Sequence, residues 1–399
     1  MHIFLNAAGA SSGSGLTYLY NVVPRLSSAS DVHTTLAVQR QLRTEFRGLR
    51  NVDVLDSAIP ESSLRRFWFE QRNLPKLIRA VKADILLSAG NFAIRNSPVP
   101  QILLSGNSLY TSADFFRDLR HRREYGVWLD TRVKGVFAKM SVDWADCTVA
   151  PSRAFANELE RWTGRKTTSV HHGFDAGVFF ADKSPLAAQV AEKLQAAEGC
   201  LKLLFVSHYN YYRNFETLFR AVSLVRQQAP ELNVRLFLTC TLDDNKTPGA
   251  YKTASAARMI RDLGIREQVI ELGAVPYQQL HKVYRACDVY VTPAYAETFA
   301  HPLVEARACG LPAIASDIPA HREICGTALF FERFSAEQLA LRIVEIATTV
   351  RKAAEPEING FSWSEHVEKL LVIASRLRSG TPENESIPAE VVTSLTRAS

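Results

Sequence analysis

The sequence lacks the cysteine patterns of secreted disulfide scaffolds and of zinc sites. Its 6 cysteines in 399 residues are spread from Cys147 to Cys325, with no CxxC pair and no Cys/His cluster. Isolated cysteines of this kind indicate reduced thiols and argue against a structural zinc ion. We therefore expect a cytoplasmic protein.

Long hydrophobic runs are also missing. No uninterrupted apolar stretch approaches the ~20 residues that cross a bilayer, and the first residues lack a basic segment followed by an apolar one. We therefore expect neither a membrane-spanning helix nor a cleaved signal peptide. The composition, 47% hydrophobic and 22% charged, is typical of globular proteins, and the net charge of +6 favours anionic partners.

Short apolar runs alternate with amphipathic stretches along the whole chain. His2–Asn6 and Asp84–Ser88 are typical of buried strands, and the alternation restarts after residue 180 with the strand Lys202–Val206. This repeated strand–helix pattern predicts parallel sheets covered on both faces. We expect an α/β protein of two doubly wound, Rossmann-like domains that face each other, with ligands bound beyond the carboxyl ends of the strands in the cleft between them.

Composition shifts suggest where these domains begin and end. We predict an amino-terminal domain over 1–175, a linker over 176–200, a second domain over 201–365, a closing helix over 366–379 and a flexible tail over 380–399. The predicted linker is polar, and the tail is rich in Pro, Ser, Thr and Glu, which favours disorder.

A basic stretch near residue 130 is predicted to form one long helix over 114–141. Its cations are interleaved with aromatic residues and diluted by acidic ones; they are Arg117, Arg120, Arg122, Arg123, Arg132, Lys134 and Lys139. Such a helix can lie on an anionic membrane, although a solvated charged face is the more common explanation. Both readings stay open. We do not expect nucleic-acid binding, because the cations are spread out and no recognition motif is present.

Glycines follow the first predicted strand. In the loop Gly9-Ala-Ser-Ser-Gly13-Ser-Gly15 the backbone can approach a ligand closely, and the amides that open the next helix favour an anion. The third glycine of a dinucleotide-binding fingerprint is missing. A phosphate-binding loop and a turn that only eases packing are both compatible with this segment.

A more specific pattern follows the predicted strand Asp288–Thr292. The loop contains Glu297, and a helix is predicted from Pro302 to Cys309, with Glu305 in its first turn. Carboxylates there can accept hydrogen bonds from sugar or ribose hydroxyls while helix amides hold a phosphate. For Glu305 alone, stabilisation of the helix dipole by ~0.3–1 kcal/mol is a sufficient explanation.

The loop after strand Lys202–Val206 carries two potential cations. His208 and Arg213 lie in Ser207-His-Tyr-Asn-Tyr-Tyr-Arg-Asn214, at the carboxyl end of a strand. A pyrophosphate would meet them there.

Together these loops resemble those of retaining glycosyltransferases of family 4, which have the GT-B fold. The segment Glu297-TFAHPLV-Glu305-ARACGLPAIAS is similar to the family's E-x7-E element. Leu272–Pro276, His172–Asp175, Pro319–Ile324 and Phe361–Trp363 resemble other family segments in the same order. The resemblance is strong from about residue 200 to 370 and looser before 150.

The resemblance implies transfer of a sugar from a nucleotide-sugar to a hydroxyl, with the anomeric configuration retained. By this analogy Glu305 binds the ribose, Glu297 the donor sugar, and Arg213 the leaving diphosphate. The backbone of Gly273 to Val275 meets the base.

The amino-terminal domain contributes less to the resemblance. Gly13 and Gly15 line the phosphate side of the implied site, and Asn107 stands where an amino-domain histidine is often found. Asn107 can hydrogen-bond a hydroxyl but is a poor general base.

Four residues in the second half depart from the family pattern at the expected donor site. His208 stands where an arginine is common, so the second phosphate cation depends on pH. Thr298, Ala300 and His301 replace the two glycines and the leucine of the family's EGFGLP, which changes the shape around the donor sugar.

We expect no cofactor and no metal, because no Asp-x-Asp lies on a suitable loop and GT-B enzymes generally need none. The expected partners are a nucleotide-sugar donor and a glycan or lipid-linked acceptor of bacterial cell-surface polysaccharide assembly, with peripheral contact at the inner membrane face as one reading of the basic stretch. Two alternatives remain: a catalytically silent GT-B protein that binds a sugar nucleotide, and a nucleotide-sugar 2-epimerase.

Overall fold

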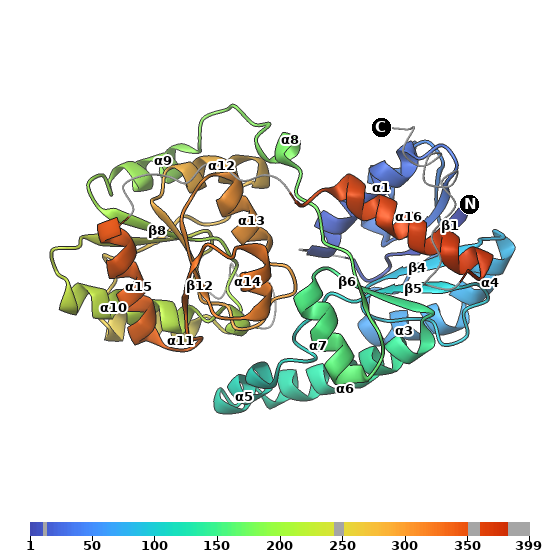
Figure 1. The fold of residues 1–399 in the computed structure, drawn as a ribbon, viewed down its shortest axis with the longest axis horizontal. Coiled ribbons are helices and arrows are strands. Elements are labelled where there is room, and N and C mark those ends of the chain that lie inside the picture. Colours follow the sequence, from blue (N-terminus) through green and yellow to red (C-terminus); the bar gives the residue numbers. More distant parts are fainter. Residues whose placement is uncertain (11–13, 243–250, 350–359, 382–399) are drawn as a thin grey trace. The chain divides into compact units, whose positions relative to one another are not determined.

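The structure is a computed structural model that describes residues 1–10, 14–242, 251–349 and 360–381 (Figure 1). By its contacts the chain divides into two units. The first comprises Met1–Thr111, Leu129–Gly173 and the described residues from Phe361 on; the second comprises Ser112–Trp128 and Phe174–Gly360. Each unit contains one parallel sheet, which confirms the predicted α/β class with two Rossmann-like domains.

The first unit is built on a 7-stranded sheet in the order β3-β2-β1-β4-β5-β6-β7. Its strands are β1 (His2–Asn6), β2 (His33–Ala37), β3 (Val52–Val54), β4 (Ile85–Ala89), β5 (Gln101–Leu104), β6 (Cys147–Ala150) and β7 (Thr168–Ser169). Its helices are α1 (Ser14–Ser28), α2 (Arg43–Phe46), α3 (Ser63–Arg72), α4 (Leu74–Ala80), α6 (Tyr125–Trp144), α7 (Arg153–Thr163) and α16 (Trp363–Ser379), with the short η1 (Arg40–Leu42).

Side chains of β1 show how both faces of this sheet are covered. Ile3 and Leu5 enter one apolar cluster, which includes residues of α1 and α16, whereas Phe4 enters the cluster on the α4 side. The alternation follows from the two-residue period of a strand. The packing of α16 against α1 explains why the last described helix belongs with the first sheet (Figure 1).

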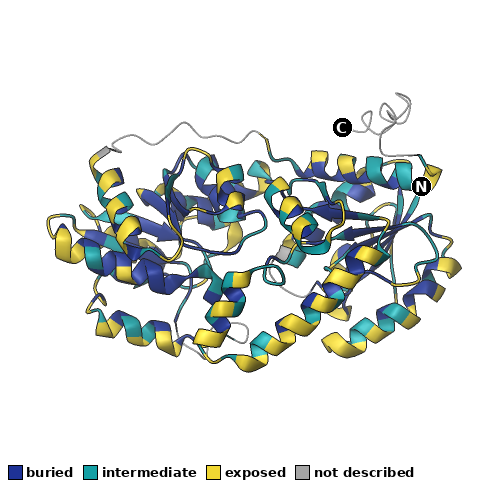
Figure 2. Ribbon diagram, turned by 60° about the horizontal axis from the view of Figure 1, so that its bottom comes forward, coloured by how far each residue is buried: buried dark blue, intermediate teal, exposed yellow. Residues whose placement is uncertain are grey.

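The second unit is built on a 6-stranded sheet in the order β10-β9-β8-β11-β12-β13. Its strands are β8 (Leu201–Phe205), β9 (Val234–Leu238), β10 (Val269–Glu271), β11 (Val289–Thr292), β12 (Ala313–Ser316) and β13 (Leu329–Phe331). Its helices are α5 (Ala113–His121), α8 (Ala176–Phe179), α9 (Ala188–Gln195), α10 (Phe215–Gln228), α11 (Ala254–Asp262), α12 (Tyr277–Arg285), α13 (His301–Ala308), α14 (Pro319–Ile324) and α15 (Ala336–Thr349), with the short η2 (Tyr211–Arg213). Figure 2 shows the strands of both sheets buried and the outer faces of the covering helices exposed.

The strand order of the second sheet determines where a ligand site can form. The chain runs outward from β8 through β9 to β10, then returns to start again at β11 on the other side of β8. In parallel sheets the loops that leave such a switch point diverge and leave room for a ligand. The loops after β8 and β11 are therefore the first place to look for a site.

The predicted long helix over 114–141 is wrong. The structure has two helices, α5 and α6, separated at residues 122–124, where Arg123 adopts a left-handed φ of 59° and Glu124 N–H donates to Leu119 O. The break lets Ser112–Trp128 pack with the second unit, whereas the sequence placed this segment in the first domain.

Other predicted boundaries differ in smaller ways. Residues 176–200, predicted as a linker, contain helices α8 and α9, and Asp175 caps α8 by accepting a hydrogen bond from Val178 N–H. The predicted tail falls mainly on residues 382–399, outside the described residues. Within the described ranges, no helix is long and apolar enough to cross a membrane.

Candidate donor site

Two loops of the second unit lie side by side at the carboxyl edge of its sheet. Ser207–Asn214 follows β8, and Pro293–Ala300 follows β11, the strand that pairs with β8. Tyr295 N–H donates to Tyr212 O at 3.0 Å, and the Asn214 amide donates to Pro293 O at 3.1 Å. These two bonds fix the loops to each other, so the structure brings together the cationic and acidic segments that the sequence singled out.

Arg213 and Glu297 form an ion pair across the two loops. Their side chains are only 17% and 10% exposed. The Arg213 Nε is buried and has no hydrogen-bond partner among the described residues. A buried guanidinium with an unused N–H is suited to binding an oxygen-rich anion, because the cost of its desolvation is already met in the free protein.

Glu305 lies on α13, the helix that follows the loop of Glu297, and is buried at 5% exposure. Tyr284 donates its hydroxyl hydrogen to Glu305 Oε2 at 2.8 Å. Burial raises the pKa of Glu305 to about 7, although the Tyr284 hydrogen bond opposes the rise. Further hydroxyl donors, such as those of a ribose, would stabilise the ionised form of this buried carboxylate by hydrogen bonding.

The placement of Glu305 differs from the prediction in one respect. Helix α13 begins at His301 rather than Pro302, so Glu305 is its fifth residue and lies beyond the first turn. The helix starts early because Ala300, the residue before it, adopts a left-handed conformation with φ of 59°. A helix-dipole role confined to the first turn therefore explains Glu305 less well than the sequence suggested.

The two histidines predicted near the donor are neutral at neutral pH. Burial and the charge of Arg213 lower the pKa of His301 to about 4. The surrounding protein and Arg213 also lower the pKa of His208, although its side chain reaches the surface. In the free protein Arg213 is thus the cation of this pair of loops, and His208 gains a charge only in acid.

Gly273 and Val275 lie on the loop after β10, in the same unit. Gly273 has a φ of +79°, which an L-residue adopts only with strain. Among the described residues, the one atom within 4 Å of a Cβ built there is Thr241 Cγ2 at 4.0 Å, so the glycine serves the backbone conformation rather than packing. A base-binding role for this loop stays a prediction.

The amino-terminal candidates belong to the first unit. Gly13 lies outside the described residues. A Cβ on Gly15 would lie 3.4 Å from Ala10, which is ordinary van der Waals contact, so packing alone does not require this glycine. Asn107 Oδ1 accepts a hydrogen bond from Leu109 N–H at 3.1 Å, which holds its carbonyl in a local turn.

Sequence reasoning missed His321, which is fully buried behind the loop that carries Glu297. Its Nδ1 faces Ser316 O at 2.9 Å, and burial lowers its pKa to about 4. Ser316 in turn donates to Ala294 O. His321 Nε2 is buried and has no hydrogen-bond partner in the described ranges. A single histidine in a helical segment carries no sequence signal of such a position.

Metal ligands do not gather here. Within the part of the chain that the structure describes, there is no group of three or more His, Cys, Asp or Glu side chains that could hold a metal ion. The Asp243-Asp244 pair lies outside the described residues.

Comparison with known proteins finds a family model that matches part of this chain. Residues 188–362 match the model of the family described as Glycosyl transferases group 1. The D-inositol 3-phosphate glycosyltransferase of Kribbella flavida is 28% identical over 234 residues, which cover 56% of this chain and 54% of that protein. The chain thus spans about half the length of this curated relative.

Solved structures share the architecture of the whole chain at low identity. Sucrose-phosphate synthase from Thermosynechococcus elongatus has a TM-score of 0.72 at 16% identity, over 95% of this chain and 100% of that one. HepE of Anabaena, in complex with UDP-glucose, has a TM-score of 0.63 at 16% identity, over 99% and 100%. The chain therefore has the GT-B fold, and its residues 188–362, which contain the candidate donor site, match the group 1 glycosyltransferase family.

Proposed function

We propose that this chain is a retaining glycosyltransferase of family 4 that moves a sugar from a nucleoside-diphosphate sugar to a hydroxyl of a glycan or lipid-linked acceptor, in cell-surface polysaccharide assembly. The observation that carries the proposal is the largely buried Arg213–Glu297 pair at the switch point of the second sheet, with buried Glu305 on the helix that follows the Glu297 loop. The family match over the same residues supports it.

Each of the three side chains has a distinct task in this proposal. Glycosyl transfer passes through an oxocarbenium-like state as a diphosphate leaves. Arg213 stabilises the negative charge that develops on the leaving group, and its unused Nε–H is the donor for a phosphate oxygen. Glu297 turns from Arg213 to the hydroxyls of the transferring sugar once the phosphates arrive. Glu305 accepts hydrogen bonds from the ribose.

A donor panel tests the proposal. Purified chain is incubated with UDP-, GDP- and dTDP-sugars, and the released nucleoside diphosphate is measured. We expect slow hydrolysis of at least one donor, reduced by about 10² or more in Glu297→Ala. Glu267→Gln, an exposed glutamate of the same unit, is the matched control and keeps the wild-type rate. A Glu297→Ala rate equal to that of the unchanged chain would remove Glu297 from the site.

A silent sugar-nucleotide-binding protein is the alternative that one observation favours. The lowered pKa of His208 leaves Arg213 without a second cation on these loops at neutral pH. Tight nucleotide binding without nucleotide release from any donor would establish this alternative. A nucleotide-sugar 2-epimerase would instead convert the donor sugar, which sugar analysis of the products detects.

Metal independence is part of the proposal, since Arg213 rather than a divalent cation neutralises the leaving diphosphate. EDTA is expected to leave donor turnover unchanged. Loss of turnover in EDTA, restored by a divalent cation, would contradict this assignment of the charge.

We also propose peripheral contact of the first unit with anionic lipid through α6. Four apolar side chains of this helix are exposed at three- and four-residue spacing, which places them on one face; they are Leu129, Val133, Val136 and Met140. Arg132 and Lys139 are exposed on the same helix. Sedimentation with vesicles of phosphatidylcholine, with and without phosphatidylglycerol, tests the contact. We expect binding only with the anionic lipid and its loss in Val133→Glu; binding without that dependence would refute it.

A further inference from the structure

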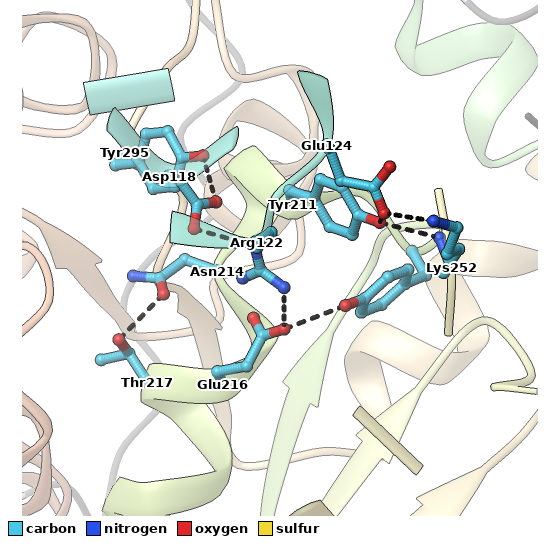
Figure 3. Close-up of polar contacts among 10 residues, drawn as sticks. Asp118, Arg122, Glu124, Tyr211, Asn214, Glu216, Thr217, Lys252 and Tyr295 are labelled. Carbon is cyan, nitrogen blue, oxygen red and sulfur yellow. Dashed lines mark hydrogen bonds and ion pairs between the residues drawn. The ribbon is translucent and has the colours of Figure 1, made fainter. Parts of the chain in front are cut away.

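Residues Ser112–Trp128, here called the arm, separate two strands of the first sheet in the sequence but pack with the second unit. The arm contains α5 and contacts both loops of the candidate donor site (Figure 3). We propose that the arm is a positioning element of the donor site, which holds the loops carrying Arg213 and Glu297 in their working arrangement. This inference rests on the proposed function, because that function is what makes those two loops the donor site.

The arm is tied to the loop of Glu297 through Tyr295. The Tyr295 hydroxyl donates to Asp118 Oδ2 at 2.8 Å, and the Tyr295 side chain is only 4% exposed. Burial, the charge of Asp118 and this hydrogen bond all raise the pKa of Tyr295, so it remains a neutral donor. Tyr295 precedes Glu297 by two residues, and its own backbone N–H bonds Tyr212 O in the other loop.

The arm is tied to the loop of Arg213 through Arg122. Arg122 Nε donates to Asp118 Oδ1, and Nη1 donates to Glu216 Oε1, both at 2.8 Å. The Tyr209 hydroxyl donates to the same oxygen of Glu216 at 2.9 Å, and the Arg122 guanidinium lies 4.4 Å from the Tyr211 ring centre. Tyr209 and Tyr211 lie on either side of Asn210 in the loop that carries Arg213, so Arg122 fixes both the loop and the start of α10.

Glu124, a second acidic residue of the arm, also belongs to this network. Tyr211 donates its hydroxyl hydrogen to Glu124 Oε1 at 3.1 Å, and Lys252 Nζ lies 2.8 Å from the same oxygen. Lys252 N–H in turn donates to the Tyr211 hydroxyl oxygen at 3.1 Å. Tyr211 is therefore held from the arm and from the segment before α11 at once.

The chemistry of these contacts favours a role of the arm in positioning the two loops over a role in stability alone. Burial opposes the charge on Arg122, but the hydrogen bond to Glu216 and the charges of Glu216 and Asp118 outweigh it and raise the Arg122 pKa. Buried ionic networks are weak sources of net stability but strict in geometry. Asp118 serves both loops, with one oxygen toward Tyr295 and the other toward Arg122. Moving the arm would move Arg213 and Glu297 together.

Nucleotide binding separates a positioning role from a merely structural one. The probe is whichever of UDP, GDP, ADP and dTDP binds the unchanged chain best, measured by titration calorimetry. We expect Arg122→Met to raise its Kd about tenfold or more, equivalent to one charge-assisted hydrogen bond, at an unchanged number of sites per chain. Arg120→Met, which changes an exposed arginine of the arm, is the control and keeps the wild-type Kd. A lower site number at unchanged Kd means that part of the sample has unfolded and overturns the positioning role.

Tyr295→Phe is the milder variant, since it removes only the hydroxyl that bonds Asp118. We expect its kcat for donor hydrolysis to fall about tenfold or more, because the Glu297 loop loses its anchor, while hydrogen exchange in β11 stays as in the unchanged chain. Wild-type kcat in Tyr295→Phe together with wild-type Kd in Arg122→Met would overturn the inference. Measurements on the unchanged chain separate a failure of this inference from a failure of the proposed function. If the proposed function is wrong, the unchanged chain neither releases nucleotide from any donor nor binds any of the four probes.

Discussion

Replacement of Glu305 by glutamine should make the protein more stable and less able to bind nucleotide. Burial raises the pKa of Glu305 from 4.5 to about 7. Since one pKa unit corresponds to about 1.36 kcal/mol, keeping Glu305 ionised in the folded chain costs up to about 3 kcal/mol. A carboxylate with so strongly raised a pKa, next to the loops of the candidate site, is a candidate for ligand binding.

The cost depends on pH in a defined direction. The folded chain holds the Glu305 proton more tightly than the unfolded chain, so the cost is absent below pH 4.5, grows between pH 4.5 and 7, and is complete above pH 7. Glutamine removes the charge but adds an amide whose N–H groups need partners, a loss of about 1–2 kcal/mol. We expect Glu305→Gln to be more stable than the unchanged chain by about 1–2 kcal/mol at pH 8 and no more stable at pH 4.5.

Hydrogen exchange of the β11 amides, Val289–Thr292, measures the opening free energy of the second unit at both pH values. Glu70→Gln is a matched control in the first unit, because Glu70 on α3 is also buried with a pKa raised to about 7. In each variant, the unit that carries the substitution should lose the pH-dependent free-energy cost of ionising the buried carboxylate. Only Glu305→Gln should weaken nucleoside diphosphate binding, by about tenfold to a hundredfold for the lost charged acceptor. Equal stability of Glu305→Gln and the unchanged chain at pH 8 would refute the buried-charge reasoning, and unchanged affinity would remove Glu305 from the nucleotide site.

Three further predictions concern single residues. Gly173→Ala should destabilise the first unit by about 3 kcal/mol or more, because its Cβ would lie 2.1 Å from Trp363 N. Gly106→Ala is the control, since Gly106 is exposed in the same unit and no described atom lies within 4 Å of its Cβ; equal thermal midpoints would contradict the close approach. Gly273→Ala should lower the free energy of unfolding of the second unit by about 1–2 kcal/mol in urea titration, through its φ of +79° alone; no loss would mean that the loop relaxes. His208 has a lowered pKa, so the affinity for nucleoside diphosphate should increase as the pH falls through that pKa. His208→Arg should bind tightly at pH 7 and show no such increase in affinity in acid. Calorimetry at several pH values tests this, and an unchanged pH profile in His208→Arg would exclude His208 from the phosphate site.

Features encoded in short stretches of sequence were predictable. The strand, loop and helix that contain Glu297 and Glu305 follow one another within about twenty residues, and proline and glycine mark the helix ends. The start of α13 was misplaced by one residue because Ala300 takes a left-handed conformation that alanine rarely adopts. The pairing of Arg213 with Glu297 was implied only by the parallel sheet, whose neighbouring strands bring the two loops together.

Features that depend on distant contacts could not be predicted. Arg122 and Glu216 are 94 residues apart, and no periodicity links them. The helix break at Arg123 has no proline or glycine at the site itself; it is stabilised by tertiary contacts of Arg122 and Glu124 that form only in the folded chain. The same contacts assign the arm to the second unit, which a division of the sequence into consecutive domains cannot represent.

The most direct test of the account is the release of nucleoside diphosphate from a panel of UDP-, GDP- and dTDP-sugars by the unchanged chain, compared with Glu297→Ala. The account predicts release from at least one donor, in EDTA as well as without it, and a rate lower by about 10² or more in the variant. No release from any donor by a chain that binds nucleoside diphosphates, or equal rates for the two proteins, would contradict it.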